Sequence, residues 1–169
     1  FHGLPPSRAR AGGESLRAYP PIRFHVTLSG GTDLSYRLQQ LPAFRVLGFG
    51  ALLGQGIEEN FQIAPRLWEK AAQRLPQLLE LMDGKPKGVL GISACEEGEQ
   101  WRYYIAVSSS QAAGKELEEV WIPACTWAVF SGSGPCPQAI QQLERRVVTE
   151  WLPGSGYEYA DAPDIEVYY

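Results

Sequence analysis

Apolar and polar residues alternate in the first patterned segment of the chain, the stretch PIRFHVTL over residues 21–28. Every second position there is apolar: Ile22, Phe24, Val26 and Leu28. A period of two is typical of a strand with one buried face, and the Gly30–Gly31 pair is expected to end it. The twenty residues before it are rich in Gly, Pro, Arg and Ser and show no sustained period. We predict a tail or linker there.

From Tyr36 onward the pattern occurs twice. The first copy predicts a strand over 43–54, a helix over 64–82 and strands over 88–95 and 101–109, and the second predicts a strand over 125–134, a helix over 137–152, a short strand near 157–161 and a strand over 164–169. The motif Phe44-x-Val46-Leu47 in the first copy resembles Trp127-x-Val129-Phe130 in the second. The pattern predicts an α+β fold of two pseudo-symmetric βαββ repeats with antiparallel sheets.

The domain boundaries follow from the same pattern. We assign residues 1–35 to a linker plus one strand and residues 36–169 to one domain, with repeats over about 36–110 and 117–169. Each helix is expected on one sheet face, which leaves the opposite faces free to form a groove between the repeats. Ordinary packing without a groove is an equal alternative at this point.

Proline positions set the expected helix limits. The first helix is expected to open near Pro65 and to kink or split at Pro76. The second is expected to begin at Pro137 and to end before Pro153 and Gly154.

The final strand, PDIEVYY, contains one acidic residue, Glu166, between apolar neighbours. A carboxylate in an apolar setting needs water, an internal partner or a ligand. Alternation gives Ile165, Val167 and Tyr169 one face, expected to meet the helix, and gives Glu166 and Tyr168 the other, expected to face the groove. By the same logic Tyr103 would face the helix in residues 101–109, and Arg102, Tyr104 and Ala106 would face the groove.

Composition narrows the function classes. The net charge is -4 with a pI near 5.2, so the chain lacks the excess of Lys and Arg that binding to nucleic-acid phosphates requires. The chain has no 18-residue apolar run and its start lacks the features of a signal peptide, so we expect a cytoplasmic protein without membrane contact. The three cysteines lack the spacing of a zinc site or disulfide framework, and no metal or cofactor is expected.

Nucleotide and nucleophile motifs are weak. The glycines of GFGALLGQG are not spaced as GxGxxG, and the only two histidines, His2 and His25, lie far from Ser133 and Cys136. Aromatic residues make up 11% of the chain. An aromatic cleft with one carboxylate suits a lipophilic or cationic organic molecule. Core packing of the aromatics, with Glu166 exposed or paired to Arg102, is the alternative.

A family resemblance is carried by the order of several blocks. The segments YRLQQLPAFRVLGFG, LWEKAA, GVLGIS, WRYYIAVS, VWIPACTWAVFSGSGP and TEWLPGSGYEYADAPDIEVYY together resemble the gyrase-inhibitor-like (GyrI-like) effector-binding domain over about residues 36–169. The upstream HGxxPSxxR, starting at His2, is similar to the junction that follows the helix-turn-helix domain of AraC-type transcription regulators. The resemblance implies a multidrug-type effector domain, contacting DNA only through a preceding DNA-binding half, as a monomer or dimer.

The resemblance also implies site residues. It places an acid at Glu166 and an aromatic at Tyr168, and around them it places aromatic residues of both repeats: Tyr103 or Tyr104, Trp68, Trp127 and Trp101. Some family members hydrolyse electrophilic toxins, and Glu166 with Tyr104 would then be catalytic. A ligand-sensing module, a hydrolase and a protein-interaction domain all stay open on sequence.

Overall fold

The computed structural model describes residues 21–28, 34–54, 57–96, 100–160 and 162–169. The tail predicted over the first twenty residues and the Gly30–Gly31 strand end lie outside them. The strands are β1 Pro21–Leu28, β2 Tyr36–Leu41, β3 Phe44–Leu52, β4 Val89–Glu96, β5 Gln100–Ser108, β6 Glu118–Ile122, β7 Cys125–Gly132, β8 Glu158–Tyr159 and β9 Asp164–Tyr168. The helices are α1 Ile57–Ala72, α2 Leu75–Glu80, α3 Gln138–Arg146, the π-helical turn η1 Val147–Trp151 and α4 Leu152–Ser155.

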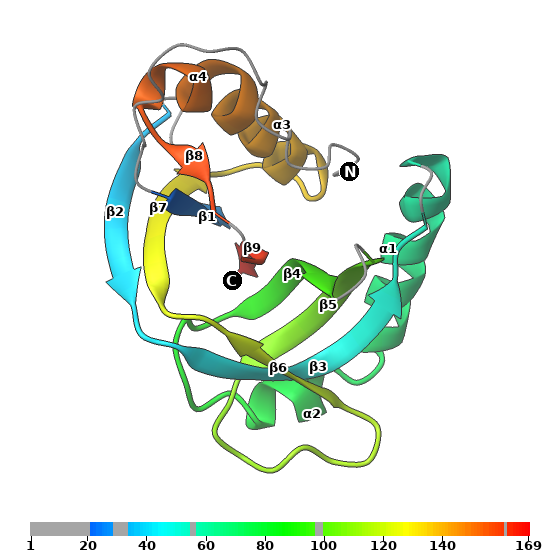
Figure 1. Cartoon of the computed structure of the whole chain (residues 1–169). Coiled ribbons are helices and arrows are strands. Elements are labelled where there is room, and N and C mark those ends of the chain that lie inside the picture. Colours follow the sequence, from blue (N-terminus) through cyan, green and yellow to red (C-terminus); the bar gives the residue numbers. More distant parts are fainter. Residues whose placement is uncertain (1–20, 29–33, 55–56, 97–99, 161) are drawn as a thin grey trace.

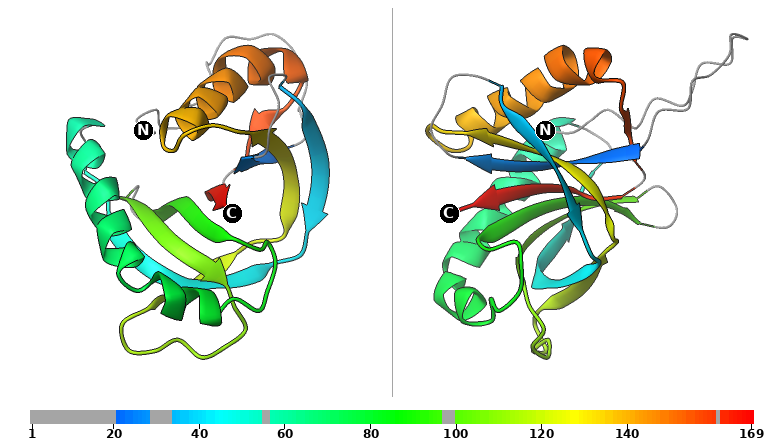
Figure 2. Two further views of the ribbon diagram at one scale, coloured as in Figure 1. Left: turned by 180° about the vertical axis from the view of Figure 1, so that it is seen from behind. Right: turned by 90° about the vertical axis from the view of Figure 1, so that its left-hand side faces the viewer.

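The strands of the described residues form one sheet in the order β2-β7-β1-β9-β4-β5-β3-β6, with β8 added beside β1. The sheet curls strongly, with α3 and α4 near one end of the curve and α1 near the other (Figure 1). Figure 2 shows the same arrangement from behind and from one side. The predicted α+β class with two pseudo-symmetric halves is confirmed.

Strand register reveals the symmetry of the two halves. β2 pairs with β7 and β3 pairs with β6, so that Leu41 lies opposite Cys125 and Phe44 opposite Ile122. These four positions flank the two matching turns Leu-Pro-Ala-Phe and Ile-Pro-Ala-Cys. Phe44 therefore corresponds to Cys125, two residues before the Trp127 that motif comparison suggested.

Both β2 and β6 lay outside the predicted strands. They are edge strands whose residues are mostly exposed, so they lack the alternation that marks a strand with one buried face. β1 was predicted as a strand, but its position was not. It lies between β9 and β7, parallel to both, as β5 lies between β4 and β3. One of the central strands of the second half, β1, thus comes from the segment that precedes the first half in the sequence.

The helices depart from expectation at their ends. α1 begins at Ile57 and carries Pro65 inside it, so the start predicted at Pro65 is wrong. The predicted break near Pro76 is confirmed, because α1 ends at Ala72 and α2 starts at Leu75. The second helix continues past Pro153 to Ser155 and closes at Gly156, whose φ is 76°. The π-helical turn η1 shifts the pattern of backbone hydrogen bonds, and α4 begins after it. Pro153 therefore lies in the first turn of α4, where its missing N–H costs no hydrogen bond.

Both faces of the sheet are buried. The face under α1 and α3 carries two clusters, one around Phe49 and Tyr103 and one around Ala128 and Phe130, and Tyr168 packs against both. The other face holds a third cluster drawn from both halves: Val46, Leu90, Ile92, Ala94, Tyr104, Ala106, Ile122, Trp127, Val129, Ile165 and Val167. The curl of the sheet therefore encloses a core to which the helices of the described residues contribute no side chain.

Candidate functional site

Glu166 lies on β9, a central strand of the sheet, and only 5% of its surface is exposed. Its neighbours along β9, Ile165 and Val167, point into the core on the opposite face. Glu166 therefore points to the face that the helices cover, where its carboxylate needs internal partners or a ligand.

Two tyrosine hydroxyls donate to the same carboxylate oxygen. Tyr103 from β5 donates to Glu166 Oε2 at 2.9 Å, and Tyr168 from β9 donates to it at 2.8 Å. Hydrogen bonds to an ionised acceptor are about twice as strong as neutral ones. The pair therefore fixes the carboxylate and supplies much of the solvation that it loses on burial.

Trp68 of α1 supports both tyrosines. Its ring meets the Tyr168 ring edge to face, with centroids 4.8 Å apart, and its proximity lowers the pKa of Tyr103 against the larger effects of burial and of the Glu166 charge.

A second carboxyl group, that of Glu144 on α3, lies close enough to Glu166 for the charge of Glu166 to raise its pKa. Glu144 follows Leu143 and lies one turn from Ile140 and Val147, which are all buried. Sequence reasoning missed this residue. The available signal was an acidic residue on the apolar stripe of a helix.

The pKa values follow from this environment. Burial raises the pKa of Glu166, and the hydrogen bonds that it accepts from Tyr168 and Tyr103 oppose the rise. Burial, followed by the charge of Glu166, raises the pKa of Glu144 well above its usual range. Both carboxyl groups therefore hold a proton to a higher pH than an exposed glutamate does. Burial and the charge of Glu166 also raise the pKa values of Tyr103 and Tyr168, which keeps both as neutral donors.

Gly91 of β4 provides the room for this cluster. It pairs with Glu166 across the β4–β9 ladder, and a Cβ at Gly91 would lie 2.5 Å from Glu166 Oε2 and 2.5 Å from Tyr103 Oη. The sequence signal was a glycine inside the predicted strand GVLGISAC, a position that often marks close approach.

The structure brings together Glu166, Tyr168, Tyr103 and Trp68 but not the other predicted site residues. Tyr104 and Trp127 are buried in the core on the opposite face, and the guanidinium of Arg102 lies over the Tyr104 ring and pairs with Glu118. Trp101 is half-buried near the start of β5, opposite Cys95.

The predicted assignment of faces is therefore wrong in one respect. The face away from the helices was expected to be free, and Tyr104 was expected on it beside Glu166. That face is filled by a core, and Glu166 and Tyr168 lie with Tyr103 on the helix side. Alternation separates two faces but does not tell which of two apolar faces a helix covers.

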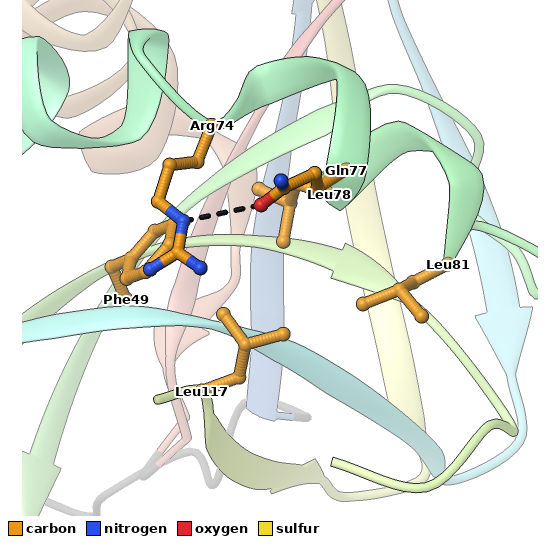
Figure 3. A pocket seen from close by; sticks show the side chains of 6 residues that line it. All are labelled: Phe49, Arg74, Gln77, Leu78, Leu81 and Leu117. Carbon is orange, nitrogen blue, oxygen red and sulfur yellow. Dashed lines mark hydrogen bonds between the residues drawn. The ribbon is translucent and has the colours of Figure 1, made fainter. Parts of the chain in front are cut away.

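A small cavity lies elsewhere, under α2. It measures about 50 Å³ and is lined mainly by apolar side chains: Phe49, Arg74, Gln77, Leu78, Leu81 and Leu117 (Figure 3). Arg74 Nε donates to Gln77 Oε1 at 3.1 Å across one end of it. None of the residues predicted for the site lines this cavity.

A family model for the GyrI-like small molecule binding domain matches residues 34–169. The chain belongs to this family. The resemblance based on sequence blocks is thereby confirmed, and the match begins after β1. Among curated proteins, no sequence matches the chain. No helix in the described part of this GyrI-like domain is long and apolar enough to cross a membrane.

Solved structures of similar fold agree with the family. A candidate bacterial transcription regulation protein from Staphylococcus aureus MU50 is 25% identical, with a TM-score of 0.70 over 80% of this chain and 87% of that one. The protein SAV2435, solved bound to tetraphenylphosphonium, is 24% identical, with a TM-score of 0.71 over 80% and 83%. An integron cassette protein from Vibrio cholerae is 18% identical, with a TM-score of 0.59 over 77% and 85%.

Proposed function

We propose that this GyrI-like domain binds a lipophilic organic cation, with Glu166 as its charge contact. The observation that carries the proposal is a buried carboxylate on a central strand, fixed by two tyrosine hydroxyls and flanked by the half-buried rings of Trp68 and Tyr168. Aromatic faces attract cations, and a desolvated carboxylate gains from a positive charge beside it. The tetraphenylphosphonium bound to SAV2435, a protein of the same fold, supports this ligand class.

The expected affinity is modest. Burial of about 300 Å² of apolar ligand surface at about 25 cal/mol/Å² supplies about 7 kcal/mol before ordering costs. Micromolar binding requires about 8 kcal/mol. Apolar contact alone therefore falls short even before ordering costs are subtracted, so micromolar binding requires the charge contact at Glu166 as well.

Titration with tetraphenylphosphonium, followed by tryptophan fluorescence, tests the proposal. Wild type should bind in the micromolar range and Glu166→Gln at least tenfold more weakly, since Gln removes the charge but keeps the volume. Triphenylphosphine oxide, a neutral probe with similar rings, should bind both proteins alike. Glu80→Gln, which changes an exposed acid on α2, is the matched control. Equal affinity of Glu166→Gln and wild type for the phosphonium would refute the charge contact.

We also propose that the domain acts as the effector-binding part of a cytoplasmic transcription regulator of the AraC type. The HGxxPSxxR motif at the start of the chain and the fold shared with a candidate transcription regulation protein support this role. The chain is acidic and lacks the excess of Lys and Arg that binds DNA phosphates, so DNA contact would come from a preceding helix-turn-helix domain. A gel-shift titration of the natural full-length protein, with and without the cation, tests the role. A ligand-independent shift, or none at all, would contradict it.

Hydrolysis of an electrophilic small molecule is the second candidate. It is favoured by the raised pKa values of two neighbouring carboxyl groups, those of Glu144 and Glu166. A carboxyl group whose pKa is raised towards neutral pH suits a general acid or general base role. Mass spectrometry of an epoxide and haloalkane panel after incubation with the protein tests this reaction. Turnover that disappears in Glu166→Gln would support it, and an unchanged panel would refute it for these substrates.

A further inference from the structure

The cavity under α2 has an apolar interior and a polar end. Its lining side chains, of which Arg74 and Gln77 are the polar ones, are Phe49, Arg74, Gln77, Leu78, Leu81 and Leu117 (Figure 3). The volume of about 50 Å³ has room for about three to five groups of water size, since one water molecule needs about 10–15 Å³. A water molecule also needs several polar partners, which the leucine and phenylalanine side chains do not offer. The interior therefore suits a short alkyl chain better than water.

Two positive charges lie over the Phe49 ring, which lines this cavity. The Lys70 ammonium group is 5.2 Å from the ring centroid, and the Arg74 guanidinium group is 5.9 Å from it. Arg74 Nε donates to Gln77 Oε1 at 3.1 Å, which holds the guanidinium across the end of the cavity (Figure 3). An anionic group at this end would be attracted by both cations while the rest of the molecule contacts the apolar interior.

The carboxylate of Glu116 already binds Arg74 in the structure. Glu116 directly precedes Leu117, which lines the cavity, and its carboxylate pairs with Arg74 Nη1. The side chains of Arg74 and Glu116 are 42% and 64% exposed. An ion pair as exposed as this contributes little to stability, so a carboxylate from solution can replace Glu116 at the guanidinium.

We propose that this cavity is a second ligand site, separate from Glu166, and that it binds a small aliphatic carboxylate. An alkyl chain of about three to five carbons fills the space between α2 and Leu117, and the carboxylate binds the Arg74 guanidinium in place of Glu116. Guanidinium and carboxylate groups match in a bidentate geometry. The volume excludes bulky rings, and Arg74 and Lys70 disfavour cations. The domain therefore has two sites that select ligands of opposite charge.

Titration with sodium butyrate, followed in two-dimensional NMR spectra of the backbone amides, tests the proposal. Butyrate combines a carboxylate with an alkyl chain that fits the volume. Wild type should show saturable shifts at the amides of Leu78, Leu81 and Leu117, with a millimolar dissociation constant because few methylene groups are buried. The neutral probe 1-butanol should bind about threefold to tenfold more weakly, since it lacks the charge. Sodium chloride at equal concentration controls for ionic strength.

Three variants separate the contributions to this binding. Arg74→Gln should bind butyrate about threefold to tenfold more weakly, whereas Arg66→Gln, at an exposed arginine of α1, is the matched control and should bind it like wild type. Glu116→Gln removes the competing carboxylate and should bind butyrate about twofold to fivefold more tightly. Leu117→Trp fills the cavity and should not bind butyrate, while its NMR spectrum shows that the protein is folded.

Several outcomes would overturn the second site. Absence of saturable shifts in wild type would do so, and so would binding that persists in Leu117→Trp, because the site would then lie outside the cavity. If Leu117→Trp does not fold, the opposite changes expected for Arg74→Gln and Glu116→Gln carry the test. Affinities equal to that of wild type in these two variants would refute binding of the carboxylate at Arg74. The phosphonium titration tests the contact at Glu166 separately.

Discussion

Replacement of Gly91 by alanine tests the geometry of the site without any ligand. The new Cβ would lie 2.5 Å from both Glu166 Oε2 and Tyr103 Oη, and real Cβ atoms essentially never approach another heavy atom within 3.0 Å. Each oxygen would therefore have to move by at least about 0.5 Å, the difference between these distances. The two oxygens are joined by a hydrogen bond of 2.9 Å, so the methyl group pushes on both partners of one bond.

The expected cost combines two effects. Overpacking a well-filled core by one methyl group costs about 1–3 kcal/mol, and loss of a hydrogen bond to a buried charged group costs about 1.5–3 kcal/mol. Displacement of the two oxygens relieves the overpacking but breaks their hydrogen bond, so the two costs do not add. We expect a loss of about 2–3 kcal/mol in the free energy of unfolding. Urea denaturation at neutral pH measures it, with an unchanged slope showing that the fold is kept.

Gly114→Ala is the control, since nothing lies within 4 Å of a Cβ at Gly114. It should leave the free energy of unfolding within about 0.5 kcal/mol of wild type. Combining Gly91→Ala with Tyr103→Phe removes one of the two crowded oxygens, so the double variant should be less destabilised than the sum of the single variants. A fully stable Gly91→Ala protein, or strict additivity with Tyr103→Phe, would refute the close approach.

Three further predictions concern the same cluster. Tyr103→Phe and Tyr168→Phe each remove one donor to Glu166, so each should lower the free energy of unfolding at pH 8 by about 1.5–3 kcal/mol in urea titrations; loss in only one of them would contradict the shared acceptor. The raised pKa values of Glu144 and Glu166 favour folding below their unfolded value of 4.5, and that contribution is lost as pH rises through the folded values. Wild type should therefore lose stability relative to Glu144→Gln between pH 5 and pH 8 in thermal melts, and parallel curves would refute the raised pKa of Glu144. Trp68→Phe keeps a ring against Tyr168 but removes the larger indole face and its N–H, so cation affinity by calorimetry should fall about threefold to tenfold. Trp121→Phe, at an exposed tryptophan on β6, should leave the affinity unchanged.

Much of this arrangement was predictable because it leaves a local trace in the sequence. Glu166 interrupts an apolar strand, and a buried acid on a strand is unusual enough to mark a site. Pro76 predicted the split between α1 and α2. The duplication was visible because both halves repeat the same alternation of strand, helix and strand.

The remaining features depend on tertiary contacts. Glu144 and Gly91 become significant only when α3 and β4 are placed against β9, since nothing local identifies what a helix face or a strand glycine will meet. Tyr104 was expected beside Glu166 because alternation placed both side chains on the face thought to lie away from the helices. The curl of the sheet separates the two tyrosines. It encloses a core on the face away from the helices, and Tyr104 is part of that core. Edge strands β2 and β6 are too exposed to show a period.

The candidate site lies on the seam between the two halves of the molecule. Tyr103 and Trp68 come from the first half, Glu144, Glu166 and Tyr168 come from the second, and the β4–β9 ladder joins them. A cation bound beside Glu166 would hold this seam by attraction to its carboxylate. β1 pairs with β9 from His25 to Thr27, opposite Ile165 to Val167, so the strand that carries Glu166 is also tied by its backbone to the segment preceding the family match. A ligand that favours one arrangement of this seam would thereby bias the position of whatever precedes β1.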